Sequence, residues 1–159
     1  MSFSREDLKN AYARWATGVT IVTARAGDRI HGMTVSAFNE VSLDPPLVLV
    51  CIDKSSSTRE VIAEGKVFAV NILERGQADL SRVFASKDDE GRRFVGLDYE
   101  AGVTGAPLLA GAVANLDCRL TATHDAGDHF IFIGEVVDLR LFEGEPLMFH
   151  DRIYRGLTR

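Results

Sequence analysis

The chain has 159 residues, of which 46% are hydrophobic and 26% are charged, and its formal net charge is −5. These values are typical of a globular protein with a sizeable core, and we predict a single domain over residues 1–159. The acidic balance, without basic clusters, argues against nucleic-acid and anionic-membrane binding. No apolar stretch approaches the ~20 residues of a membrane span, and the polar first residues do not resemble a secretory signal.

The first half of the chain predicts a helix followed by several strands. Ser4 and Asp7 match a capping box, and Tyr12 and Trp15 fall on one face of a helix predicted over residues 5–16. The segments after this helix are β-branched or continuously apolar, which is typical of strands. We predict these strands over residues 19–23, 30–38, 47–52 and 67–73.

Two shorter helices are predicted farther along. Ser57 and Glu60 match a second capping box, with Ser57 as the cap and Gly65 placed to end the helix. An apolar stripe that ends at Phe84 predicts a third, short helix. A charged loop over residues 86–93 follows it.

The last third of the chain predicts a long antiparallel hairpin. Residues 112–123 alternate in polarity, with Asn115 and Asp117 on the polar face, and a second strand covers residues 130–141. Residues 124–129 would connect the two strands. Because strands follow strands with only brief helices between them, the sequence predicts a mainly β fold, an antiparallel barrel with short peripheral helices.

The cysteines and histidines give no sign of a disulfide or a metal site. Cys51 and Cys118 lie far apart in apolar, strand-like segments, which predicts two buried thiols in a reducing compartment. The four histidines lack metal-ligand spacing, and neither H-E-x-x-H nor C-x-x-C occurs. We therefore expect a cytoplasmic protein without a bound metal.

Several common catalytic motifs are also missing from the sequence. No G-x-G-x-x-G follows a strand, and neither a Walker A motif nor G-x-S-x-G occurs. Rossmann dehydrogenases, kinases and serine hydrolases are therefore disfavoured.

One local pattern is suited to binding phosphate. The segment Asp53-Lys54-Ser55-Ser56-Ser57-Thr58 follows a buried strand and opens a capped helix. Amides at a helix start carry unmet donors and partial positive charge, and hydroxyls and one ammonium gather beside them. The alternative is ordinary helix capping by a serine in a solvated turn.

Four weaker patterns are also candidates for binding. The small side chains of Thr34-Val35-Ser36-Ala37-Phe38-Asn39 would let a planar ligand approach the backbone, although an ordinary barrel strand has the same composition. His129 at a hairpin tip and the loop arginines Arg92 and Arg93 could each point at a ligand or only at solvent. Arg152 and Tyr154 have the same ambiguity.

Taken in order along the chain, these segments resemble the short-chain flavin reductase family. The segments that carry the resemblance are Trp15–Thr23, Gly32–Phe38, Val41–Val48, Phe68–Leu73, Gly105–Leu109, Gly127–Val136 and Pro146-Leu147 with Tyr154. The Ser-Leu-Asp-Pro-Pro and Gly-Asp-His blocks are the most specific of them. The resemblance covers nearly the whole chain.

The resemblance implies a fold and a set of site residues. The fold is an FMN-binding split β-barrel, and members are usually homodimers with flavin near the dimer interface. Thr34, Val35, Ser36, Ala37 and Asn39 would line the isoalloxazine ring. Asp53, Lys54, Ser55, Ser57 and Thr58 would hold the flavin phosphate, with Ser86 and Arg92 approaching from the charged loop. His129, Arg152 and Tyr154 would lie on the nicotinamide side.

The implied reaction is hydride transfer from NADH or NADPH to FMN or FAD, which supplies reduced flavin to a partner monooxygenase. His129 is the side chain expected to touch the reacting rings, where it would position them or balance charge. Asn39 and Glu40 replace the small hydroxyl residues of many relatives, which leaves the choice between FMN and FAD open. The alternatives are a flavin-binding electron carrier or store without NAD(P)H turnover, and a structural domain with an empty barrel.

Overall fold

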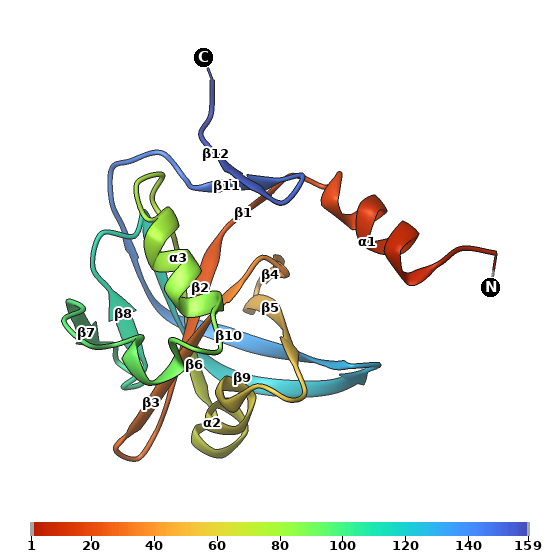
Figure 1. Ribbon diagram of the computed structural model, residues 1–159. Coiled ribbons are helices and arrows are strands. Elements are labelled where there is room, and N and C mark those ends of the chain that lie inside the picture. The colour runs from red at the N-terminus through yellow and green to blue at the C-terminus, as the bar shows by residue number, and fades with distance from the viewer. Residues whose placement is uncertain (1, 159) are drawn as a thin grey trace.

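The computed structural model describes residues 2–158 and consists mainly of β-strands (Figure 1). Its helices are α1 (Arg5–Ala13), α2 (Ser57–Gly65) and α3 (Ala78–Ala85), followed by a 3-10 turn, η1 (Glu90–Arg92). Its strands are β1 (Thr17–Gly18), β2 (Thr20–Ala26), β3 (Arg29–Val35), β4 (Phe38–Leu43), β5 (Pro46–Asp53), β6 (Val67–Ile72), β7 (Tyr99–Ala101), β8 (Pro107–Leu109), β9 (Ala114–Ala126), β10 (His129–Leu141), β11 (Met148–His150) and β12 (Ile153–Arg155). Within this described range, every helix is too short or too polar to cross a membrane.

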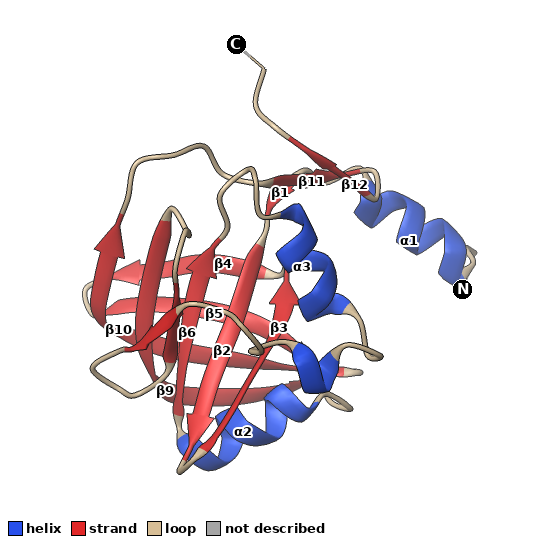
Figure 2. Ribbon diagram, turned by 60° about the vertical axis from the view of Figure 1, so that its left-hand side comes forward, coloured by secondary structure: helices blue, strands red, loops and turns tan. Residues whose placement is uncertain are grey.

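One seven-stranded antiparallel sheet organises the fold, in the order β3-β2-β6-β9-β10-β5-β4. Its edge strands β3 and β4 are consecutive in the chain, and only Ser36 and Ala37 separate them. The sheet therefore curls until its two edges approach, and Figure 2 shows β2 and β6 crossing in front of β4 and β5. The curled sheet encloses the core, where Ile52, Phe68 and Phe132 are buried.

The structure divides the predicted strand over residues 30–38 into two strands. β3 ends at Val35 and β4 begins at Phe38, because the chain turns between them. β4 was not predicted as a separate strand, since its Asn39 and Glu40 are poor strand formers and the turn has no glycine or proline.

The long hairpin is confirmed with a shorter connection than predicted. Its turn is Gly127-Asp128, and residues 124–126 continue β9. Polar residues at these positions favoured a loop, but both strands project far enough to pair there.

Both long helices begin close to the expected residues. Ser4 and Asp7 form the predicted capping box, with the Asp7 amide donating to Ser4 Oγ at 3.1 Å. α1 ends at Ala13, short of the predicted residue 16, because the chain extends toward β1. Ser56 caps α2, so the prediction of Ser57 is wrong by one residue: Ser56 has extended backbone angles and Ser57 is already helical.

The polar face of β9 is partly buried. Asn115 and Asp117 lie under the segment that carries β7 and β8, which covers this face. Asp117 accepts a hydrogen bond from the Thr104 amide at 2.9 Å, and Asn115 donates to the Asn71 side chain at 2.8 Å. The buried Asn115 and Asp117 side chains thus both have hydrogen-bond partners, which offsets the cost of burying them.

Candidate functional site

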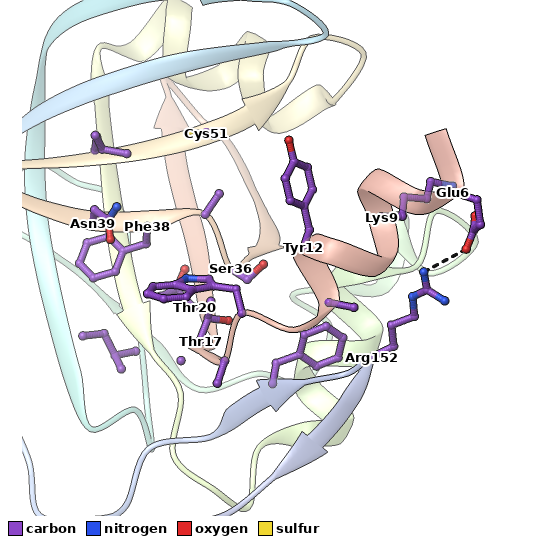
Figure 3. Close-up of a pocket in the computed structure, with 18 residues that line it drawn as sticks. Glu6, Lys9, Tyr12, Thr17, Thr20, Ser36, Phe38, Asn39, Cys51 and Arg152 are labelled. Atoms are coloured by element: carbon purple, nitrogen blue, oxygen red, sulfur yellow. Dashed lines mark hydrogen bonds and ion pairs between the residues drawn. The ribbon is translucent and has the colours of Figure 1, made fainter. Parts of the chain in front are cut away.

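A groove of about 990 Å³ opens between α1 and one end of the curled sheet (Figure 3). The β3–β4 link and β5 form one side, and α1 with the segment after it forms another. The β11–β12 hairpin contributes Phe149 and Arg152. The volume of the groove is within the range of pockets that hold small molecules and cofactors.

The β3–β4 link places small side chains along the groove. Ser36 and Ala37 line it and are exposed, while the Ala37 carbonyl accepts a hydrogen bond from the Cys51 amide at 3.0 Å. On β5, Leu49 and Cys51 face the groove and Val50 between them is buried, as strand alternation requires. A planar ligand can therefore approach the backbone of the link closely.

The two cysteines differ in their surroundings. Both are free thiols, and Cys118 is buried, which raises its pKa to about 12. Cys51 is only partly buried because it faces the groove, so the prediction of two buried thiols is correct for Cys118 alone.

Aromatic side chains from the start of the chain also contribute to the groove. Tyr12 and Trp15 are 68% and 77% exposed, and both line the groove. None of the residues of α1 is buried. The Asp151 amide donates to the Ala13 carbonyl at 2.8 Å and ties the end of α1 to the β11–β12 turn.

The rim of the groove beside α1 is charged. Arg152 Nη2 donates to Glu6 Oε1 at 3.1 Å and to Asn10 Oδ1 at 2.9 Å, and Lys9 lies beside them. Arg152 has a φ of 62°, a left-handed backbone conformation that is unfavourable for residues other than glycine. Such conformations concentrate at functional sites.

The structure brings four of the predicted residues together: Ser36, Ala37, Asn39 and Arg152 line the groove. Thr34 faces elsewhere, since its hydroxyl donates to the Ser81 carbonyl at 2.6 Å. Val35, the remaining residue of the predicted ring site, packs in the core.

The predicted phosphate segment is ordered by its own side chains. The Asp53 carboxylate accepts hydrogen bonds from the Ser55 hydroxyl at 2.6 Å and the Ser55 amide at 2.7 Å, and these bonds lower the pKa of Asp53. Lys54 pairs with Asp125 at 2.7 Å and lies over the Phe130 ring. Its ammonium is thus held against the β9–β10 hairpin.

The hydroxyls that follow on α2 face β3 and η1. Thr58 is fully buried, and its Oγ1 lies 2.7 Å from His31 Nδ1. His31 Nε2 in turn lies 2.8 Å from Glu90 Oε1 in η1. The start of α2 is therefore connected through His31 to the charged loop that is expected to approach it.

Within that loop, the two neighbouring arginines have different surroundings. Arg92 is exposed and lies 3.9 Å from Asp89, whereas Arg93 is buried. Arg93 donates to the Gly32 and Ser86 carbonyls, each at 2.8 Å, and so joins the loop to β3. Arg93 thus holds Ser86 in place through the Ser86 backbone carbonyl.

The three residues expected on the nicotinamide side lie apart in this chain. His129 pairs with Asp53 in the β10–β5 register and contacts Asp128 at 2.7 Å. Tyr154 Oη lies 2.8 Å from Ser81 Oγ, against α3. Arg152 alone lines the groove.

Other residues of the groove were not predicted as site residues. Thr20 begins β2, Tyr12 and Trp15 are predicted only to share a helical face, and no prediction was made for Phe149. The shared helical face of Tyr12 and Trp15 was the one available signal. Phe149 reaches the groove because β11 pairs with β1, a contact between distant segments.

Comparison with known proteins gives one consistent family. The model of the flavin reductase like domain matches residues 12–158. The chain is 44% identical over 151 residues to FMN reductase (NADH) SmoA of Agrobacterium fabrum, covering 95% of this chain and 85% of that protein. It is 34% identical over 152 residues to HsaB, the reductase subunit of a flavin-dependent monooxygenase of Mycobacterium tuberculosis, covering 94% and 80%.

A solved structure agrees with these relatives. The NADH:FAD oxidoreductase of Streptomyces globisporus, in complex with NAD and FAD fragments, superposes with a TM-score of 0.91 at 37% identity. The match covers 98% of this chain and 93% of that one. Sequence and structure thus lead to the same conclusion: the chain belongs to the flavin reductase-like family.

Proposed function

We propose that this protein is an NAD(P)H:flavin oxidoreductase that transfers a hydride to FMN or FAD and supplies reduced flavin to a monooxygenase. The observation that supports this proposal most strongly is the groove beside the exposed β3–β4 link, in a chain that belongs to the flavin reductase-like family. Flavin reductases of both FMN and FAD, and a monooxygenase reductase subunit, are among its relatives. Bound flavin would supply the hydride acceptor.

The residues present suit a flavin. β3 is an edge strand, so alternate amides and carbonyls face away from β2 without a strand partner. Ser36, Ala37 and Asn39 would contact the ring, where their small size admits a planar group. From Ser36 to His31, β3 spans about 16 Å at ~3.3 Å per residue. A flavin along this edge would direct its phosphate toward Ser57, with Asp53, Lys54, Ser55, Thr58, Ser86 and Arg92 shaping the surroundings.

His129 is proposed to position the nicotinamide against the flavin ring. Its side chain is part-exposed at the end of β10, beside the phosphate segment. His129→Ala is expected to lower kcat for NADH oxidation about 10-fold while the Kd for flavin, measured by fluorescence quenching, changes less than twofold. Equal losses of turnover and flavin affinity, or no loss of either, would contradict this role.

The proposed assembly is a homodimer of split barrels. The split barrel is supported by the two edge strands β3 and β4, which a two-residue link joins. A single domain over residues 1–159 is supported by the one sheet that runs from β2 to β10. α1 projects from the sheet with Tyr12 and Trp15 exposed, which favours a second copy against it (Figure 1). Two free cysteines agree with a cytoplasmic location.

The test is oxidation of NADH and NADPH by purified protein with FMN, FAD or no flavin. We expect steady turnover that requires added or bound flavin. The rates show whether the enzyme prefers NADH or NADPH and whether it prefers FMN or FAD. Flavin binding without NAD(P)H consumption would instead identify a carrier, and absence of flavin binding would overturn the proposal.

A further inference from the structure

A polar cluster joins α2, β3 and η1 beside the proposed phosphate site. His31 Nε2 lies 2.8 Å from Glu90 Oε1, and His31 Nδ1 lies 2.7 Å from Thr58 Oγ1. A carboxylate only accepts, so Nε2 carries the proton and Nδ1 of the neutral ring accepts from Thr58. Burial lowers the pKa of His31, in agreement with a neutral ring.

Glu90 is the acceptor at the centre of this cluster. The Ser57 hydroxyl beside it contributes most to lowering the pKa of Glu90, and the Arg93 guanidinium contributes further. The Glu90 side chain is 37% exposed, so it can leave the cluster without unfolding the chain. Through His31, which also contacts Thr58, the carboxylate thus lies beside the first turn of α2, where an anion is best stabilised.

Arg93 provides an independent sign that the cluster is suited to a further anionic group. Its side chain is 7% exposed, and within residues 2–158 its Nε has no hydrogen-bond partner. Arg93 lines a cavity of about 460 Å³ together with His31 and Glu90. A buried unpaired donor is costly, and a second acceptor here would satisfy it.

We propose that Glu90 is an internal competitor of the flavin phosphate: its carboxylate occupies the His31 donor beside the start of α2 until the phosphate displaces it. This inference rests on the proposed function, because it requires the phosphate at the start of α2. Glu90 then determines how strongly the site favours phosphorylated flavins over riboflavin. The phosphate and the carboxylate are both anionic acceptors, so their mutual repulsion keeps them from occupying the same donor together.

The test compares FMN with riboflavin, which has the same ring and lacks the phosphate. The substitution Glu90→Gln keeps the shape of the side chain and removes its negative charge. We expect the Kd for FMN to fall about fivefold and the Kd for riboflavin to stay within twofold of the wild type. Glu64→Gln is the matched control, since Glu64 on α2 pairs with Arg29 of β3 at an exposed position.

A second variant tests whether Ser57, on the first turn of α2, is also a contested donor. In a Ser57→Ala background, Glu90→Gln is expected to improve FMN binding less than it does in the wild type, because one contested donor is gone. An unchanged or weaker FMN affinity in Glu90→Gln, or an equal gain for riboflavin, would overturn the inference while leaving the reductase intact. If the wild type bound neither flavin, the proposed function itself would fail.

Discussion

Replacing Ala37 by Trp is expected to lower flavin-dependent NADH oxidation at least about 100-fold while the protein still folds. The Ala37 side chain is exposed along the groove, so an indole there fills the space proposed for the flavin ring. The backbone is not disturbed, because the Ala37 carbonyl keeps its bond from Cys51. Steady-state rates of NADH oxidation with FMN and FAD measure the loss of activity. Thermal unfolding shows whether the variant still folds.

The matched control places the same indole outside the groove. Val103, between β7 and β8, is 69% exposed and does not line it. Val103→Trp should keep wild-type turnover and melting temperature. Full activity in Ala37→Trp would show that flavin does not bind beside the β3–β4 link.

Replacing Gly65 by Ala is expected to destabilise the fold by about 3 kcal/mol, the cost of overpacking a close contact. A Cβ at Gly65 would lie 1.8 Å from the Arg25 carbonyl oxygen, so backbone must move. Because α2 packs on β2 through Val61 and Ile62, its last turn has little freedom to retreat. Thermal unfolding should show a melting temperature lower by about 6–12 °C.

Gly91 is the control for this substitution. It lies in η1, and a Cβ there meets no atom within 4 Å. Gly91→Ala should change the unfolding free energy by less than about 0.5 kcal/mol. A melting temperature of Gly65→Ala close to that of Gly91→Ala would mean that α2 moves away from β2 at little cost.

Local patterns predicted the secondary structure well wherever one strong signal was present. The capping box at Ser4, the glycine at 65 and the alternation in β9 each depend on neighbours within a few residues. The errors occurred where two local choices are nearly equal. Ser56 and Ser57 can both cap a helix, and the β3–β4 link looks like a continuing strand.

The candidate site was predicted only in part, for a related reason. Ser36, Ala37, Asn39 and Arg152 follow from the family resemblance and do line the groove. Trp15 and Phe149 reach it through contacts between the two ends of the chain. No pattern within a short segment contains that information.

The sequence by itself determined the mainly β class and the family, because periodicity, caps and motifs are local properties. Only the tertiary structure decided which side chains meet. The pairing of β1 with β11 brings Phe149 to the groove, the β10–β5 register sets His129 next to Asp53, and loop packing puts Glu90 beside His31. These contacts join residues far apart in the chain, and burial of the shared core selects them.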